Sequence, residues 1–470
     1  MPRQSVTIIG AGLVGSLLAA LLAQRGLRVE VFERRPDPRV HGFLGGRSIN
    51  LALAERGLNA LRQAGLADAV LKQAVMMRGR MVHPLDGSTN LQPYGVDDSE
   101  VIWSVSRGDL NMLLMDAAER AGANLHFDAP LLDASFDGTT NVMSIGHDRD
   151  DAREHEAAAV IGADGAGSAL RAAMMRNADL GERVEPLGHG YKELEIPPLL
   201  PSLALGPGQS LAGMTSECFA LEPNALHIWP RGHYMCIALP NAQGSFTVTL
   251  FLPNEGPHPS FATLPDVDAA HAFFRQEFAD ALELMPTFDE DWNAHPVGQL
   301  ATLYLDRWRL DGRALLVGDA AHAIVPFHGQ GMNAGFEDAV ELADLLQAQP
   351  DDADAVFARF QNVRKPNADA IAAMALENYI EMRDGVADPH YLAKRELTAA
   401  LTARAPGHFM SRYRMVSFTR LPYSYCRQRG HEQDALLEFL LAGNAGVADI
   451  DLDAAAARAR VELPPLPLPD

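Results

Sequence analysis

The pattern of hydrophobic and polar positions predicts a βαβ unit at the start of the chain. Residues 5–10 read SVTIIG, a short β-branched run that favours a strand. Residues 13–26 read LVGSLLAALLAQRG, with apolar positions at helical spacing and a glycine where the helix would end. The alternating run RVEVFER at 28–34 then predicts a second strand. A strand, a glycine turn and a helix recur at 157–174, AAAVIGADGAGSALRAAM.

In the middle of the chain, apolar residues occur at every second position. This alternation predicts antiparallel strands of a separate sheet, in the runs HGYKELEIP (189–197), ALHIWP (225–230), YMCIALP (234–240) and SFTVTLFLP (245–253). The segment 79–107 predicts further strands and a hairpin, and the apolar run at 314–317 predicts a buried parallel strand. After about residue 350 the pattern is mostly helical. Because the two kinds of segment alternate along the chain, we expect interleaved domains.

Composition narrows the class of protein. The 470 residues suffice for two or three domains, and a net charge of −22 argues against binding to nucleic acid or to anionic membranes. The three cysteines, an odd number, form no CxxC pattern, which favours reduced thiols in the cytoplasm. The apolar run 6–23 contains three glycines and continues into a polar strand, so we expect neither a targeting segment nor a membrane anchor.

The glycines after the first predicted strand favour a dinucleotide. Gly10, Gly12 and Gly15 fit GxGxxG, where the first allows a tight turn, the second admits a pyrophosphate and the third lets the helix pack closely. The helix N-terminus would face the phosphates, and Glu33 at the end of the next strand could accept hydrogen bonds from a ribose. A carboxylate there favours a ribose without a 2'-phosphate, as in FAD or NAD. The alternative is a glycine-rich packing turn.

A second unusual stretch, GDAAHAIVPFHGQGMNAGFEDA at 318–339, is rich in glycine and poor in charge. Asp319 could accept a hydrogen bond from a ribityl or ribose hydroxyl. The backbone from Gly329 to Asn333 could approach a planar ring and begin a helix whose end stabilises negative charge. The turn containing Asp164 could be a third cofactor contact, or an ordinary connection between strand and helix.

The order GxGxxG, a DG turn followed by Arg171, and GDAAH…P..GQGMN resembles the single-component (group A) flavin-dependent aromatic hydroxylases. Further motifs are similar to the members of that family that hydroxylate kynurenine, and extend the resemblance over nearly the whole chain: GRSINLALAERG (46–57), MMRGRMVH (76–83), LQPYG (91–95), HGYKELEI (189–196), VPFHGQGMN (325–333) and ALENYIEM (375–382).

The resemblance implies FAD as cofactor, and NADPH, O2 and L-kynurenine as substrates, in tryptophan degradation. An FAD C4a-hydroperoxide would hydroxylate the ring to give 3-hydroxykynurenine. No catalytic side chain and no metal site are assigned, since the flavin would carry the chemistry, and the docking site of NADPH and a homodimer are left open. Two alternatives remain: a related hydroxylase for another aromatic acid, and a flavin-binding redox protein without hydroxylase activity.

The resemblance also assigns a substrate site. An arginine and a tyrosine would hold the substrate carboxylate, with polar contacts from the helical C-terminal region and an aromatic wall beside the ring. The residues so assigned are Arg80, Tyr94, Phe327, His328, Asn378 and Tyr413. Arg80 could instead be a surface arginine, and His328 departs from the animal and fungal pattern, where a second Phe follows the first. His322 is interpreted as a structural, hydrogen-bonded histidine.

The cofactor site combines the motif residues with positions that match the family. It comprises Gly10, Gly12, Val14, Gly15, Glu33, Arg34, Ala52, Arg107, Leu132, Asp164, Asp319, Gln330, Gly331, Met332 and Asn333. Arg107 could instead be an exposed strand end, and Gln330 could contact either the flavin or the substrate.

The expected fold is mixed α/β, with a glutathione-reductase-like FAD domain, an antiparallel substrate domain and a helical region that closes the active site. The FAD domain would comprise residues 1–75, 107–185 and 301–350, the substrate sheet an insertion at 76–106 together with 186–300, and the closing region 351–470.

Overall fold

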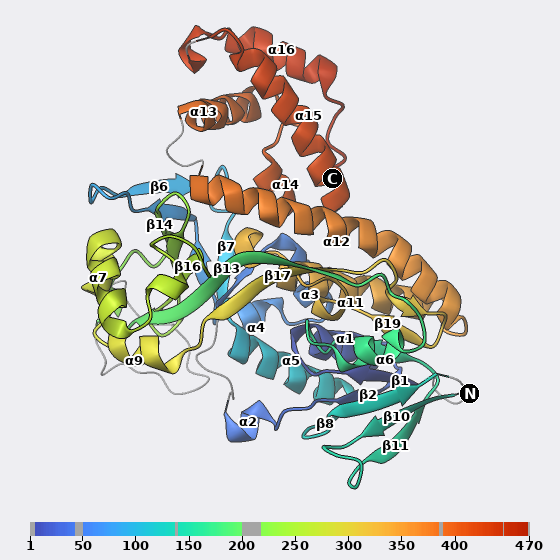
Figure 1. Ribbon diagram of the computed structural model, residues 1–470. Coiled ribbons are helices and arrows are strands. Elements are labelled where there is room, and N and C mark those ends of the chain that lie inside the picture. The colour runs from blue at the N-terminus through green and yellow to red at the C-terminus, as the bar shows by residue number, and fades with distance from the viewer. Residues whose placement is uncertain are drawn as a thin grey trace.

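A computed structural model describes residues 5–42, 50–136, 140–199, 218–384, 389–444 and 446–468 (Figure 1). Two large sheets organise the molecule. The long helix α12 runs across it, and helices α13, α15 and α16 stack beyond α12, on the side away from the N-terminal sheet.

The N-terminal sheet has six strands in the order β18-β19-β12-β1-β2-β8. Its members are β1 (Ser5–Ile9), β2 (Arg28–Phe32), β8 (Asn124–His126), β12 (Val160–Gly162), β18 (Arg309–Leu310) and β19 (Ala314–Leu316). All neighbours are parallel except β18 and β19, which confirms the predicted parallel strand near 314. Helix α1 (Leu13–Gln24) packs against α5 (Arg107–Ala121) and α11 (Gly331–Ala348).

The second sheet has seven strands in the order β17-β13-β16-β15-β14-β5-β6. Its members are β5 (Gly79–Val82), β6 (Asn90–Pro93), β13 (Arg183–Ile196), β14 (Ala225–Pro230), β15 (Met235–Pro240), β16 (Phe246–Pro253) and β17 (Gly298–Tyr304). We expected an antiparallel sheet, but β5 and β14 pair in parallel, because the hairpin β5–β6 joins the edge from a distant part of the chain. One face packs on α7 (Val267–Glu277), α8 (Ala279–Leu282) and α9 (Phe288–Ala294) around an aromatic core.

Two three-stranded sheets complete the β-structure of the described residues. One is β3-β7-β4, formed by β3 (Asn50–Leu53), β4 (Val75–Met77) and β7 (Ile102–Ser106). The other is β11-β10-β9, a meander of β9 (Leu131–Ser135), β10 (Asn141–Ile145) and β11 (Arg153–Ala157) that the sequence pattern did not predict.

The remaining helices confirm the helical pattern after residue 350. They are α12 (Ala353–Asp384), α13 (Pro389–Arg404), α14 (Arg412–Phe418), α15 (Tyr423–Leu441) and α16 (Leu452–Glu462). Shorter helices are α2 (Pro38–His41), α3 (Glu55–Gln63), α4 (Ala67–Leu71), α6 (Ala169–Met175) and α10 (Asp319–His322), with 3-10 turns η3 (Phe261–Thr263), η4 (Pro326–His328) and η6 (Val447–Asp449).

A search of the described residues for a helix that is both long and apolar enough to cross a membrane finds none. The division of the chain into the six segments given above stays a prediction.

Candidate active site

The glycine turn between β1 and α1 has the geometry of a dinucleotide cradle. Gly10 has φ of 98°, which favours glycine, and a Cβ on Gly15 would lie 2.0 Å from the Gly10 carbonyl oxygen, so only glycine allows this approach. A Cβ on Gly12 would meet no atom of the described residues within 4 Å, its chain neighbours aside. Gly12 is the N-cap of α1 and provides no side-chain bond to it, so first-turn N–H groups remain available to a ligand.

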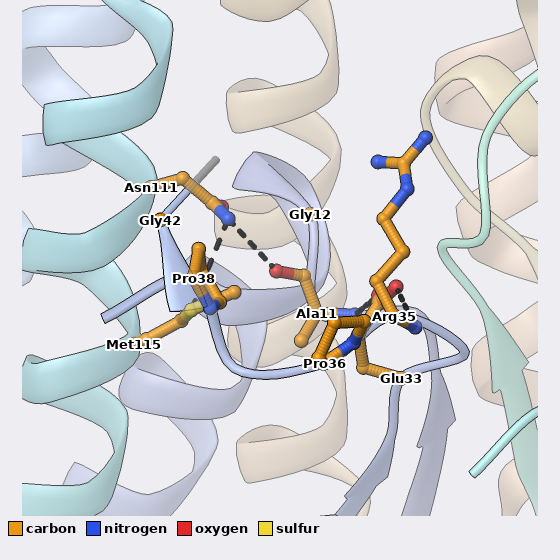
Figure 2. Close-up of a pocket in the computed structure, with 9 residues that line it drawn as sticks. All are labelled: Ala11, Gly12, Glu33, Arg35, Pro36, Pro38, Gly42, Asn111 and Met115. Atoms are coloured by element: carbon orange, nitrogen blue, oxygen red, sulfur yellow. Dashed lines mark hydrogen bonds between the residues drawn. The ribbon is translucent and has the colours of Figure 1, made fainter. Parts of the chain in front are cut away.

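A pocket of about 390 Å³ opens beside this turn (Figure 2). Glu33, at the end of β2, accepts a hydrogen bond from the Ala11 amide at 2.8 Å. Asn111 of α5 donates to the Ala11 carbonyl at 3.2 Å, and its own side-chain oxygen is buried without a partner among the described residues. Buried polar atoms rarely lack a partner in folded proteins. The open backbone, the carboxylate and the unpartnered oxygen fit the adenosine diphosphate part of FAD.

Asp164 lies close to the same turn. A Cβ on Gly10 would come within 2.8 Å of the Asp164 Cα. One carboxylate oxygen accepts from the Leu170 amide, whereas the other is buried with no partner in the described part of the chain. Burial raises the pKa of this carboxyl above its ordinary value. A ligand hydroxyl would satisfy the open oxygen.

The Val14 side chain, in the first glycine motif, lies against Gly318 of the GD motif and against Gly335, which follows the GQGMN motif. A Cβ on Gly318 would lie 3.1 Å from the Val14 side chain, and one on Gly335 would lie 2.6 Å from it. Gly318 also has φ of 56°. Two glycines therefore let the end of β19 and helix α11 pack directly on α1.

Asn333 holds the N-terminus of α11 in place. Its side-chain oxygen accepts from the Ala54 amide at 3.0 Å, and its amide donates to the carbonyls of Ala52 and Gly329 at 2.9 Å each. Gly331 and Met332 begin the helix beside it. Gln330 is buried, and its side-chain oxygen accepts from the Tyr423 hydroxyl at 2.8 Å. The side chains of Asn333 and Gln330 thus carry structural bonds, while first-turn amides of α11 are left for a ligand.

Four predicted cofactor residues are exposed. Arg34 is exposed after β2, Asp319 is exposed in the first turn of α10, and Arg107 is exposed at the first position of α5. Leu132 is 40% exposed on β9, three residues after Ala129, whose amide donates to the Glu33 carbonyl. Their contacts to a cofactor stay predictions.

The structure brings the predicted substrate residues together from distant parts of the chain. Tyr94 follows β6, and its ring stacks on Tyr413 of α14 with centroids 5.3 Å apart. Tyr413 also stacks on His328 at 5.5 Å. The Arg80 guanidinium, on β5, lies over the rings of Tyr94 and Tyr413, at 5.6 and 5.1 Å from their centroids.

Arg80 has the properties of a binding cation. No carboxylate of the described residues lies within 4.0 Å of its guanidinium, although the group is half-buried. Burial opposes its charge, but the nearby hydroxyls of Tyr413 and Tyr94 and the carboxylate of Glu381 hold its pKa above the ordinary value. A charge-assisted pair with an incoming carboxylate would satisfy it.

Phe327 and Asn378 form the adjoining wall. The Asn378 amide donates to the Phe327 carbonyl at 2.6 Å, which ties α12 to η4. The Phe327 ring packs on Tyr379 at 4.2 Å and on Phe251 at 5.0 Å. These contacts make an apolar surface next to the polar end at Arg80.

His328 is neutral at ordinary pH. The ring is buried, and burial together with the charges of Arg412 and Arg80 lowers its pKa to about 3. Its Nδ1 atom has no partner among the described residues. The side chain can therefore offer one acceptor or donor to a ligand, but not a positive charge.

Sequence reasoning missed a buried ionic network behind the site. Asp338, fully buried on α11, accepts from Arg364 and His322 at 2.6 Å each and from the Gly318 amide at 2.9 Å. Burial opposes ionisation of Asp338, but these partners lower its pKa to about 2. The contact of His322 agrees with its interpretation as a structural residue.

Arg56 of α3 extends the network to the C-terminal region. It pairs with Glu337 at 2.8 Å, donates to the carbonyls of Val416 and Leu421, and lies 3.8 Å from the centroid of the Tyr423 ring. The only sequence signal was an arginine on the apolar side of a short helix.

Comparison with known proteins identifies the family. A family model described as an FAD binding domain matches residues 3–185 and 279–374. The chain is 56% identical to kynurenine 3-monooxygenase of Xanthomonas axonopodis pv. citri (strain 306) over 467 residues, covering 99% of this chain and 98% of that protein. It is 54% identical to kynurenine 3-monooxygenase of Stenotrophomonas maltophilia (strain K279a) over 465 residues, 98% of each.

Solved structures confirm the fold at lower identity. The tetrameric form of 2-methyl-3-hydroxypyridine-5-carboxylic acid oxygenase superposes with a TM-score of 0.65 at 19% identity, covering 84% of this chain and 96% of that one. P. aeruginosa PqsL in complex with 2-aminobenzoylacetate gives a TM-score of 0.63 at 21% identity, covering 81% and 97%. Because the relatives match over nearly the full chain and the family model covers more than half of it, the chain belongs to the kynurenine 3-monooxygenase family of FAD-dependent monooxygenases.

Proposed function

We propose that the protein catalyses the 3-hydroxylation of L-kynurenine with FAD as cofactor and NADPH and O2 as co-substrates. The observation that carries the proposal is the Arg80 guanidinium over Tyr94 and Tyr413, next to an apolar wall and without an ion pair to any described carboxylate. L-Kynurenine has the matching chemistry, since it combines an amino-acid carboxylate with an aromatic ring. The family supports the same substrate.

The residues of the site bind and orient the substrate. Arg80 binds the carboxylate, with the hydroxyls of Tyr94 and Tyr413 beside it, and the ring lies against Phe327. His328, which is uncharged, places a neutral ring nitrogen at the same wall. Binding of the carboxylate at Arg80 fixes the direction in which the substrate lies, and thereby selects the ring position that reacts.

FAD would be held by the glycine turn at Gly10–Gly15, by Glu33 and Asp164, and by the first turn of α11. When bound, it supplies electron transfer and oxygen activation, chemistry that amino-acid side chains lack. The protein contributes an enclosure that keeps water from the reacting atoms. The sum of the reaction is L-kynurenine, O2, NADPH and H⁺ giving 3-hydroxykynurenine, water and NADP⁺.

The test is NADPH oxidation by the purified yellow protein with and without L-kynurenine, together with chromatography of the product. We expect strong stimulation and one 3-hydroxykynurenine per NADPH. Stimulation without product would identify kynurenine as an effector and point to another aromatic acid as substrate. No stimulation would favour a flavin-binding protein that does not hydroxylate.

NADPH docking, a homodimer and a cytoplasmic location remain predictions. A groove of about 1390 Å³ lies beside the adenosine pocket, between the start of α5 and the face of the second sheet that carries Glu193 and Thr247. Its carboxylates do not favour the phosphates of NADPH, and we assign it no ligand.

A further inference from the structure

We propose that two ion pairs, Arg412–Glu377 and Arg414–Glu100, position Tyr413 and thereby keep the substrate pocket closed to water. The inference rests on the proposed function, because it concerns the same pocket. Arg412 and Arg414 are the immediate neighbours of Tyr413 on α14. Each pairs with a part of the chain that carries another predicted substrate residue.

Arg414 binds the turn that follows Tyr94. Its guanidinium donates to both oxygens of Glu100, at 2.7 and 2.5 Å, which is the bidentate geometry that gives an arginine–carboxylate pair its directional strength. The two side chains are only 13% and 17% exposed. Glu100 also accepts from the Val96 amide at 3.1 Å, so the carboxylate shapes the turn as well as holding the helix.

The turn itself is closely packed on Glu100. A Cβ on Gly95 would lie 2.1 Å from the Glu100 Cβ, so the chain folds back on itself directly after Tyr94. A movement of Glu100 must therefore move the backbone next to Tyr94.

Arg412 makes the corresponding bond on the other side of Tyr413. It donates to Glu377, the residue before Asn378 on α12, and its aliphatic part packs against Gly430 of α15, where a Cβ would lie 2.7 Å from the Arg412 Cδ. Glu377 is shared with Arg427 at 3.4 Å. This pair is more exposed than the first, at 25% and 32%, and we expect it to contribute less.

Helix α14 depends on such contacts. It has seven residues, and helices this short are not stable by themselves in water. Its buried residues Met415 and Val416 fix it on the inner side, and Arg56 binds the Val416 carbonyl. Among the described residues, the ion pairs of Arg412 and Arg414 connect its Tyr413 end to α12 and to the turn after β6, beside the stacking of Tyr413 on Tyr94.

The chemical consequence concerns how NADPH is used. In a closed pocket, L-kynurenine, O2, NADPH and H⁺ yield 3-hydroxykynurenine, water and NADP⁺. In a pocket that admits water, NADPH, H⁺ and O2 yield NADP⁺ and hydrogen peroxide, with L-kynurenine unchanged. A loosened Tyr413 wall should therefore raise peroxide at the expense of product.

The experiment compares Arg414→Gln, Glu100→Gln and the charge-exchanged double variant Glu100→Arg with Arg414→Glu. The control is Arg309→Gln on β18, in the other large sheet, which removes the ion pair between Arg309 and Asp354 at the start of α12. Three quantities are measured on the FAD-loaded full-length protein: the ratio of 3-hydroxykynurenine to hydrogen peroxide, the Kd for L-kynurenine from flavin difference spectra, and backbone hydrogen exchange over residues 412–418.

We expect each single variant to exchange faster over 412–418, to bind L-kynurenine about tenfold more weakly, corresponding to ~1.4 kcal/mol, and to release a larger share of NADPH electrons as peroxide. The charge-exchanged variant should recover part of each quantity, and Arg309→Gln should match the unsubstituted protein. The proposal is overturned if Arg414→Gln and Glu100→Gln both match the unsubstituted protein in hydrogen exchange over 412–418, in affinity for L-kynurenine and in the ratio of product to peroxide.

The two proposals fail in different ways. If the unsubstituted protein makes no 3-hydroxykynurenine, the proposed function fails, and hydrogen exchange over 412–418 still tests whether the pairs hold α14. If product forms but the variants retain full coupling, the function stands and the positioning role is wrong. If the double variant does not fold, the two neutral single variants decide the outcome.

Discussion

At the scale of single residues, the predicted substrate site depends on an arginine that forms no ion pair with the described residues. Arg80 is half-buried, and no carboxylate of the described chain lies within 4.0 Å of it. Its neighbour Arg78, one residue before β5, is exposed and paired with Asp98 at 2.9 Å. Arg78 thus has its counter-ion in the protein, whereas we propose that the counter-ion of Arg80 is the substrate carboxylate.

Arg80→Ala is expected to weaken L-kynurenine binding by about 2–4 kcal/mol, because a charge-assisted pair is lost. FAD content should be unchanged, since Arg80 lies apart from the glycine turn. Titration of the flavin spectrum with L-kynurenine measures the affinity, and Arg78→Ala is the matched control. Equal affinity in Arg80→Ala and the unsubstituted protein would contradict the carboxylate assignment.

At the scale of elements, close backbone packing creates the cofactor edge. Helix α1 approaches β1 because Gly15 has no Cβ, and α11 approaches α1 because Gly335 has none. Gly12 differs, since its side-chain space is open on the protein side. One glycine therefore serves packing, and another leaves room for a ligand.

Gly12→Ala and Gly15→Ala should separate these roles. We expect Gly12→Ala to lower FAD affinity at least about tenfold, or ~1.4 kcal/mol, with little change in the melting temperature of the apoprotein. Gly15→Ala should lower both, because its Cβ would lie 2.0 Å from the Gly10 carbonyl oxygen. Equilibrium dialysis of FAD and calorimetry of the apoprotein measure the two effects; full FAD affinity in Gly12→Ala would refute the ligand role.

The ionic network behind the site connects α10, α11 and α12. Asp338→Asn should destabilise the protein by about 3–5 kcal/mol, because the buried Arg364 loses its fully buried partner and keeps only Glu337, which it shares with Arg56. Asp344→Asn, on the same helix but 56% exposed, is the control, and we expect a change below about 1 kcal/mol. Denaturant unfolding measures both. A similar loss in the two variants would mean that burial of the pair is unimportant.

At the scale of the whole molecule, buried histidines make stability depend on pH. The Nδ1 atom of His227 shares a hydrogen bond with the Nε2 atom of His83 at 2.8 Å. The Nε2 atom of His227 donates to the Glu222 carbonyl at 2.9 Å. Burial lowers the pKa of His227 from 6.5 to about 4, assisted by His83 and opposed by Asp280. Below pH 6.5 His227 binds a proton in the unfolded chain but stays neutral in the folded protein. The free energy of unfolding therefore decreases as the pH falls from 6.5 toward about 4.

The difference between those two pKa values corresponds to roughly 3 kcal/mol for His227. We expect the melting temperature to decrease between pH 6.5 and 4, and His227→Gln to reduce the slope. Calorimetry at several pH values is the measurement, and an identical slope in His227→Gln would show that this histidine is not responsible. Asp338 affects stability at lower pH. Its contribution is lost as the pH falls from the ordinary pKa of 3.8 through about 2, where the folded protein also becomes protonated at this carboxylate.

The sequence by itself determined the features that are local. The turn at Gly10–Gly15, the helix after it and Glu33 at the end of β2 follow from spacing, because a tight turn needs glycine whatever surrounds it. The alternating runs of β13 to β16 were equally readable, since period two places one face in the core. The meander β9–β11 was missed, because strands such as REHEA carry little apolar alternation.

Tertiary structure alone decided which distant residues meet. The pattern could not show that β5 pairs in parallel with β14, that Arg414 binds Glu100, or that Asp338 binds Arg364. The chain contains 39 arginines and lysines and 61 aspartates and glutamates, so composition permits many ion pairs and selects none. Even where the family resemblance marked Arg80, Tyr94 and Tyr413, only the fold showed one ring stacked on the other and the guanidinium lying over both. The physical reason is that long-range contacts are selected by the packing of whole elements, which no local stretch encodes.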